Sequence, residues 1–311
     1  MSTPDQLVFG TRGSKLARYQ TNLVAKKLTA IFTDLTAKTI IFSTKGDREL
    51  SKSLPEIGGK GLFTAELEAA LRQHTIDLAV HSLKDLPTED SPGLTIGAIL
   101  PRANPADVLV SRQGYTLDTL PWGATVGTSS LRRRAQLLAY RPDLAISSLR
   151  GNVDTRIQKA LNPTGPYDAI ILAAAGLKRV GLDAHISQFI PFDLMLPAPG
   201  QGAIAVQCRA DDEATLSKLA QLNHAPTYQA VLAERAFLAG LGGGCSLPVG
   251  ALGQVNGETL EIQGVVADLD GRRLVRVVQH GAAVDAQAIG QALAQQALIQ
   301  GAREILEAVR V

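Results

Sequence analysis

Short runs of β-branched and apolar residues alternate with amphipathic segments over the first two hundred residues of the chain. The runs predict strands at 7–11, 38–44, 77–82, 94–100, 124–130, 144–150 and 167–176. Apolar residues at helical spacing predict helices at 15–32, 62–73, 131–141 and 153–161. This alternation of strand and helix favours doubly wound α/β units.

Two proline-rich breaks interrupt the α/β pattern. PRANPA at 101–106 precedes a strand, DVLVS, and IPFDLMLPAPGQG at 190–202 precedes another, AIAVQCR. Breaks that flank a middle block indicate two α/β domains joined by crossover segments, with a cleft between them. The two breaks are the expected hinges that flank the middle block.

The pattern changes after about residue 220. A long helix is predicted at 226–240, then a glycine loop, a hairpin over 260–279 that turns at Asp270 and Gly271, and a terminal helix over 285–309 interrupted at Gly301. These elements predict a small α+β third domain.

Composition narrows the class of protein. Of the 311 residues, 45% are hydrophobic and 19% are charged, as in a soluble globular protein. A net charge of +2 and 4% aromatic residues argue against wholesale binding to nucleic acid or to a membrane. The N-terminal sequence has no signal-peptide pattern and no apolar run is long enough to span a membrane, so we expect a cytoplasmic protein.

Basic side chains gather where strands end and helices begin. Because a helix N-terminus carries partial positive charge, cations there are unfavourable unless an anion offsets them. In open α/β sheets these junctions share one edge, where ligands bind. Each arginine alone could be a solvated surface residue, but together they predict a cleft for a polyanion. The cations are Arg12, Lys15, Lys60, Arg132, Arg133, Arg150 and Arg156, with Ser14, Ser130 and Asn152 as expected N-caps.

One acidic residue, Asp85, follows the strand at 77–82 at the same edge, beside Lys84. It could be an Asx-turn residue before Pro87. It could also be a carboxylate at the centre of a basic cleft, able to stabilise a developing cation or to move protons.

The segment GLGGGCSLPVG at 240–250 holds Cys245, one of two cysteines in the chain. Three glycines before it clear an approach for something large. Neither cysteine lies in a CxxC pair, and no metal-ligand spacing, GxxxxGK[ST] or GxSxG motif is present. The sequence therefore predicts no metal site and supports neither a P-loop enzyme nor a serine hydrolase.

Taken together, the motifs resemble the porphobilinogen deaminase (hydroxymethylbilane synthase) family over nearly the whole chain. The matching stretches are TRGSKLA, GGKGLFTAELE, DLAVHSLKDLPT, VGTSSLRRRAQL, SLRGNVDTR, YDAIILAAAGLKR, LPAPGQGAIAVQCR, ERAFLAGLGGGCSLPVG and QGAREIL. The resemblance implies a transferase that joins four porphobilinogen molecules head to tail, releases ammonia at each addition and gives linear hydroxymethylbilane. It also implies a dipyrromethane cofactor, bound covalently through Cys245, that primes the chain.

The resemblance assigns roles to the residues at this edge. Asp85 matches the catalytic carboxylate, and Cys245 serves as an anchor. The residues expected to hold the cofactor are Cys245, Asp85, Lys84, Arg132, Arg133, Ser130 and Ser14. Those expected to bind substrate carboxylates are Arg12, Arg150, Arg156, Arg179 and Lys60. Glu56 departs from the lysine that many relatives carry in that loop.

The family fold resembles two-domain periplasmic binding proteins with a third α+β domain. We expect a first domain of residues 1–101 plus 202–220, a second of 102–201 and a third of 221–311, in a monomer. A plastid location is the alternative if a transit peptide was removed. The rival interpretation is a non-catalytic two-lobed polyanion-binding protein, in which Cys245 would be incidental and Asp85 would oppose anion binding.

Overall fold

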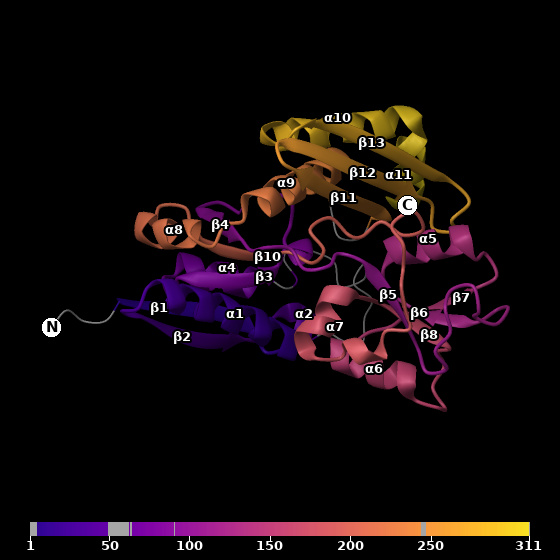
Figure 1. Cartoon of the computed structure of the whole chain (residues 1–311), viewed down its shortest axis with the longest axis horizontal. Coiled ribbons are helices and arrows are strands. Elements are labelled where there is room, and N and C mark those ends of the chain that lie inside the picture. Colours follow the sequence, from indigo (N-terminus) through magenta and orange to yellow (C-terminus); the bar gives the residue numbers. More distant parts are fainter. Residues whose placement is uncertain (1–4, 49–61, 63, 90, 244–246, 311) are drawn as a thin grey trace.

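The computed structural model describes residues 5–48, 62, 64–89, 91–243 and 247–310 (Figure 1). Three sheets form its framework, two of five strands and one of three. The two larger sheets belong to two α/β lobes, and the small sheet lies with the C-terminal helices above them in the view of Figure 1.

The first lobe is built on the strand order β2-β1-β3-β10-β4. Strands β1, β2 and β3 are parallel, whereas β10 runs antiparallel to both β3 and β4. Strand β10 follows the whole second lobe in the sequence, so the chain must come back to the first lobe to complete this sheet. The elements are β1 (Asp5–Arg12), α1 (Lys15–Ile31), β2 (Leu35–Phe42), α2 (Lys45–Arg48), α4 (Ala65–Arg72), β3 (Leu78–Ser82), the 3₁₀ turn η1 (Leu83–Asp85), β4 (Leu94–Ile99), β10 (Ile204–Arg209) and α8 (Glu213–Ala220).

The second lobe repeats this arrangement with the order β7-β6-β8-β5-β9. Here β6 is parallel to β7 and β8, and β5 is the antiparallel strand between β8 and β9. The elements are β5 (Asp107–Ser111), β6 (Thr125–Gly127), α5 (Leu131–Tyr140), β7 (Ala145–Ser147), α6 (Val153–Leu161), β8 (Ala169–Ala173), α7 (Ala174–Val180), η2 (Asp183–His185) and β9 (Gln188–Phe189).

The predicted helices at 15–32, 131–141 and 153–161 are confirmed within a residue by α1, α5 and α6. The strand predicted at 167–176 is wrong in its second half, because β8 ends at Ala173 and α7 begins at Ala174. Alanine has high helix propensity and low strand propensity, so the run of alanines turns into a helix once the sheet edge is reached.

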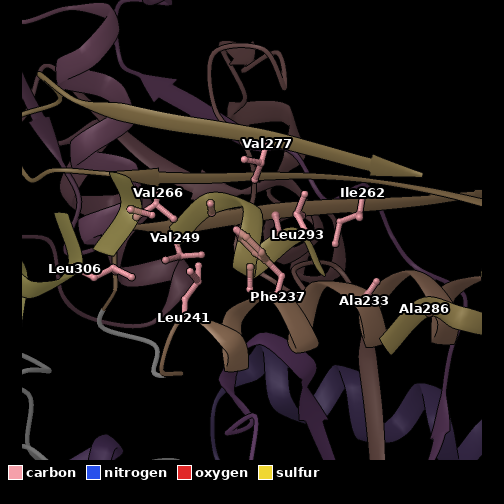
Figure 2. Close-up of a cluster of buried hydrophobic side chains, with 14 of the residues drawn as sticks. Ala233, Phe237, Leu241, Val249, Ile262, Val266, Val277, Ala286, Leu293 and Leu306 are labelled. Carbon is pink, nitrogen blue, oxygen red and sulfur yellow. The ribbon is translucent and has the colours of Figure 1, made fainter. Parts of the chain in front are cut away.

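The third unit is a three-stranded antiparallel sheet covered by helices, with Phe237 of α9 packed among apolar side chains of the sheet and of α10 (Figure 2). The predicted hairpin and the interruption at Gly301 are confirmed, and Gly271 and Gly301 have positive φ angles of 70° and 100°. The elements are α9 (Ala225–Gly240), β11 (Val249–Asn256), β12 (Thr259–Ala267), β13 (Leu274–Ala282), η3 (Ala283–Asp285), α10 (Ala286–Ala297), a π turn η4 (Leu298–Ala302) and α11 (Arg303–Arg310).

The two crossovers between the lobes lie side by side. The Ala103 amide donates to the Gly202 carbonyl over 3.2 Å, and the Leu100 amide donates to the Ile204 carbonyl over 3.1 Å. Gly202 has a φ of 88°, and a Cβ there would lie 2.5 Å from the Ala103 oxygen. The close approach of the two segments therefore requires glycine at this position.

The third unit contacts both lobes. Arg235 on α9 donates to the Pro87 carbonyl of the first lobe over 2.7 Å. At the other end, Arg134 on α5 of the second lobe donates to the Leu269 carbonyl in the turn between β12 and β13 over 3.1 Å. The structure thus has the predicted class, two binding-protein-like α/β lobes with a small α+β unit. Within the described residues, no helix is both long enough and apolar enough to cross a membrane.

Candidate active site

A cavity of about 370 Å³ lies where the two lobes and the third unit meet. It is lined by the residues around the start of α1, by η1, by the starts of α5 and α6, and by the second crossover. Leu238, Leu247 and Val249 of the third unit complete the lining. Of the predicted site residues, those that line it are Arg12, Ser14, Lys84, Asp85, Ser130, Arg132, Arg133, Arg150 and Arg156.

Asp85 ends the 3₁₀ turn that follows β3, so the end of a buried strand sets its position. It also borders a second, smaller cavity of about 60 Å³ that contains His81 and Gln20. No hydrogen bond or ion pair to the Asp85 carboxylate is formed by the part of the chain that the structure describes. A half-buried carboxylate of this kind is available to a ligand.

Serine caps fix two of the helix starts, as the sequence predicted. Ser14 accepts a hydrogen bond from the Ala17 amide at 3.2 Å, and Ser130 accepts one from the Arg133 amide at 3.5 Å. Asn152 occupies the N-cap position of α6, but its side chain forms no capping bond. The caps direct the first turns of α1 and α5 toward the cavity.

Arg132 and Arg133 both bind Asp107, a carboxylate at the start of β5 that is fully buried. Arg132 Nη1 and Arg133 Nη2 each lie 2.7 Å from an Asp107 oxygen, and Arg133 Nε adds a hydrogen bond of 3.1 Å. Burial alone would raise the pKa of Asp107, but the two guanidinium groups outweigh it and hold the pKa well below its usual range. Asp107 is therefore a permanent anion that fixes both arginines.

One anion leaves this pair of arginines with an uncompensated positive charge. Arg156 adds to it from α6, where its Nε donates to the Gly151 carbonyl over 2.7 Å. Burial, together with the charges of Arg133 and Arg150, lowers the pKa of Arg156 to about 10. Neighbouring positive charges disfavour the charged form of Arg156. A ligand whose carboxylates bind beside these arginines would offset that repulsion.

Lys84 adds a cation from the first lobe, and its Nζ donates to Gln201 Oε1 over 3.3 Å. Burial lowers the pKa of Lys84 to about 8; the charges of Arg133 and Arg132 act in the same direction, and those of Asp85 and Asp107 oppose them. With a pKa of about 8, this ammonium is still mostly charged at neutral pH.

Of the predicted site residues that the structure describes, Arg179 does not line the cavity. Arg179 lies on α7 and donates from Nη2 to the Gly202 carbonyl over 2.7 Å, so in this structure it supports the crossover. Cys245 and Lys60, together with the departure at Glu56, fall outside the described residues.

Sequence reasoning missed two residues that organise this site, Asp107 and Gln201. The signal that could have identified Asp107 is its place at the start of DVLVS, where an acidic residue precedes a run of apolar residues typical of a buried strand. A buried charge needs a partner of opposite charge. Gln201 sits in APGQG, at the end of the proline-rich break at 190–202, and nothing in its sequence context marks it.

The second cysteine, Cys208, is fully buried in the first lobe's core, and burial raises the pKa of its thiol to about 11. A thiol held protonated in this way is a poor nucleophile. The described residues hold no group of three or more histidine, cysteine or acidic side chains arranged to bind a metal ion.

The fold and the site define a class: a two-lobed α/β protein whose interdomain cavity gathers more cations than carboxylates and is suited to a small molecule with several carboxylates. Family models then give the particular assignment. Residues 7–217 match the model described as the dipyromethane cofactor binding domain of porphobilinogen deaminase, and residues 228–298 match the C-terminal domain of the same family. The chain belongs to the porphobilinogen deaminase family.

Curated relatives agree over almost the full length. The porphobilinogen deaminase of Brevibacillus brevis is 52% identical over 302 residues, which cover 96% of each chain. That of Pelotomaculum thermopropionicum is 51% identical over 305 residues, covering 98% of this chain and 97% of the relative. Among solved structures, the sulfate-bound regulatory domain of OxyR2 from Vibrio vulnificus has 15% identity and a TM-score of 0.43, and the match covers 71% of this chain and 96% of that one.

The cavity residues fit the dipyrromethane cofactor that the family model describes. Its pyrrole rings carry acetate and propionate groups, and the cavity presents Lys84, Arg132 and Arg133 to such groups. The uncompensated charge around Asp107 and the lowered pKa of Arg156 are what a bound polycarboxylate would relieve. The interpretation as a non-catalytic polyanion-binding protein is not favoured by this family membership.

Proposed function

We propose that this cavity is where the chain, as a hydroxymethylbilane synthase, joins four porphobilinogen molecules head to tail and releases ammonia at each addition. The protein is a transferase of tetrapyrrole synthesis that carries a dipyrromethane cofactor. When bound, the cofactor supplies a terminal pyrrole carbon to which the next unit is added. The observation that carries the assignment is the placement of Asp85 in a cavity whose other charged groups are mostly cations.

The arginines bind and orient the pyrrole carboxylates. We assign Arg132, Arg133 and Lys84, with Ser130 and Ser14, to the cofactor, and Arg12, Arg150 and Arg156 to incoming substrate. A guanidinium binds a carboxylate through two parallel hydrogen bonds, which fixes orientation as well as affinity. Lys60 is proposed to add a further cation. For Arg179, the proposed substrate contact would require it to leave the Gly202 carbonyl.

Asp85 is the proposed catalytic residue. A carboxylate without a hydrogen-bond or ion-pair partner among the described residues can stabilise the positive charge that develops as ammonia leaves the pyrrole. It can also accept and return a proton during coupling and product release. Its charge interacts with those of the neighbouring cations Lys84 and Arg156.

Cys245 is the proposed attachment point of the cofactor. The chain has two cysteines, and the other, Cys208, is buried in a core with its pKa raised. Leu247, two positions after Cys245, lines the cavity. Two residues of chain span at most about 7 Å, so an attachment at Cys245 is within reach of this cavity.

The remaining proposals concern organisation. The domain limits are those expected from the sequence: 1–101 with 202–220, 102–201, and 221–311. They are supported by the three separate sheets and by the return of β10 to the first sheet. We further propose a monomer that works in the cytoplasm on its small-molecule substrate porphobilinogen.

The test is the intact mass of the protein purified from a host that makes porphobilinogen. We expect an excess of two linked pyrrole units on the wild-type chain and on Cys208→Ser, and a bare chain for Cys245→Ser. The buried Cys208 is the matched control, because it is the only other thiol in the sequence. A wild-type chain that stays bare after incubation with porphobilinogen would rule out the cofactor assignment.

A further inference from the structure

Gln201 lies on the second crossover, lines the cavity and is fully buried. Both ends of its side-chain amide are used. The nitrogen donates to the Pro105 carbonyl over 2.7 Å and to Asp107 Oδ1 over 2.9 Å, while the oxygen accepts from Lys84 Nζ at 3.3 Å.

These contacts join the two lobes. Lys84 follows β3 of the first lobe, whereas Asp107 opens β5 of the second. Because Asp107 also binds Arg132 and Arg133, a continuous line of polar contacts runs from the Lys84 ammonium to both guanidinium groups.

We propose that Gln201 is a positioning residue, whose amide holds Lys84 at a set place relative to Arg132 and Arg133, so that cations from two lobes form one array. The proposal rests on the proposed function, in which this array binds the carboxylates of the pyrrole chain. It assigns Gln201 no contact with the reacting atoms.

The chemistry of the neighbours requires an uncharged amide here. An ammonium can only donate hydrogen bonds, and an ionised carboxylate and a backbone carbonyl can only accept them. The amide oxygen must therefore face Lys84, and the nitrogen must face Asp107 and Pro105. A carboxylate in its place would repel Asp107, and an apolar side chain would form none of the hydrogen bonds to Lys84, Asp107 and Pro105.

The Lys84 ammonium reports on this link. The charged groups that act on it are Asp85 beside it, and Asp107, Arg132 and Arg133 across the crossover. Burial lowers the pKa of Lys84 to about 8, which brings its titration into an accessible pH range. Loss of an acceptor for the charged form must lower this value further.

The experiment follows the lysine ε-carbon signals by NMR on the full chain with its cofactor, across roughly pH 6–10, a range that brackets the lowered pKa of Lys84. The Lys84 signal is assigned by its loss in Lys84→Arg. In Gln201→Met, we expect the Lys84 midpoint to fall by about one pH unit, the size of one lost hydrogen bond to a charged group. In Gln201→Glu, an acceptor remains and the midpoint should not fall.

The matched control is Gln136→Met. Gln136 is also buried and also bonds to the crossover, through the Leu196 amide and carbonyl at 2.8 and 3.1 Å, but it does not bond to Lys84. Its loss should leave the Lys84 midpoint where it is. If Gln201→Met does not fold, Gln201→Asn withdraws the amide by one methylene, and the same fall is expected.

An unchanged midpoint in Gln201→Met, or an equal fall in Gln201→Met and Gln136→Met, would overturn the proposal, because either result means that Gln201 only packs. The intact mass of each variant shows separately whether the pyrrole units are present. A failed cofactor assignment is thus distinguished from a failed role for Gln201.

Discussion

The carboxylate of Glu234 binds the Arg102 guanidinium through two hydrogen bonds, 2.5 Å from Nη1 and 3.1 Å from Nη2. The same carboxylate accepts the Gly200 amide at 2.6 Å and the Gly253 amide at 2.7 Å. Arg102 belongs to the first crossover, Gly200 to the second and Gly253 to β11 of the third unit. One fully buried side chain therefore connects both crossovers to the small domain.

Glu234→Ala should destabilise the protein by about 3–5 kcal/mol, because it leaves the Arg102 charge and two backbone amides without their acceptor. Glu234→Gln should cost less, since one oxygen remains. The midpoint of denaturant unfolding measures both. Asp270→Ala, which removes a 3.5 Å pair with Arg134 in which Asp270 is 67% exposed, should hardly move the midpoint. Similar losses for the Glu234 and Asp270 variants would contradict this account.

Gly271→Ala should loosen the turn between β12 and β13 from α5. Gly271 has a φ of 70°, and an added Cβ would lie 2.6 Å from the Ala135 carbonyl oxygen of that helix. Gly257→Ala is the matched control, because φ is 60° there and nothing lies within 4 Å of the added carbon.

Both of these alanine variants incur the cost of a left-handed backbone, about 1–2 kcal/mol. Only Gly271→Ala adds a steric overlap with another domain. We therefore expect a larger drop in the unfolding temperature for Gly271→Ala, with faster hydrogen exchange in α5. Equal drops would show that the turn does not depend on contact with α5.

His81 should make the protein less stable in mild acid. Burial lowers its pKa from 6.5 to about 4, although a hydrogen bond of 3.2 Å with Gln207 opposes the shift. Between these values the unfolded chain binds a proton that the folded chain does not. The stability that His81 contributes is therefore complete above pH 6.5 and is lost as the pH falls toward 4.

The measurement is the free energy of unfolding at several pH values through this range. In His81→Gln the decline should be shallower than in the wild type, by roughly 3 kcal/mol between the two ends. His280→Gln, at an exposed histidine, should leave the decline unchanged. A parallel decline in wild type and His81→Gln would refute the assignment.

Asp85→Asn should lower kcat by about 100-fold or more, because an amide can neither hold a negative charge beside the developing cation nor take up a proton. The unfolding temperature should change little, since the carboxylate has no partner in the described part of the chain. Steady-state rates of bilane formation on cofactor-loaded protein provide the test.

Asp154→Asn is the control for Asp85→Asn. Asp154 also lines the cavity, but it is exposed on the first turn of α6. Its neutralisation removes a negative charge from a carboxylate-binding site, so its rate should stay within a few fold of wild type. A comparable loss in both variants would mean that net charge, and not the position of Asp85, governs the rate.

The sequence predicted the elements with strong hydrophobic periodicity and the serine N-caps at which two of the helices begin. Helix α1 buries Ala17, Thr21, Val24 and Leu28 at spacings of three and four, so its pattern and its Ser14 cap identify it without the fold. Strand β11 was missed because VGALGQVN contains glycines and a polar end, and its pairing with β12 comes from the tertiary structure.

The basic residues at the helix starts were predictable from the sequence, whereas Asp107 and Gln201, which hold them in place, were not. Basic residues next to helix N-caps can be recognised in the sequence, because a positive charge there is unfavourable beside the positive end of the helix dipole. Asp107 lies 25 and 26 positions from its two arginines, and Gln201 lies 117 positions from Lys84. Asp107 meets its arginines only when the second lobe folds, and Gln201 meets Lys84 only where the chain returns from the second lobe to the first, so no local pattern encodes either contact.

The side-by-side crossovers bear on how the cavity could change size. We expect two neighbouring connections to leave rotation about the line through them as the easiest motion of the lobes, because other rotations would strain the Ala103–Gly202 hydrogen bond. Residues beside that line, such as Gln201 and Asp107, should then move least. Under the proposed function, space for a longer pyrrole chain should therefore open at the rim farthest from the crossovers, while the cations nearest to them stay in place.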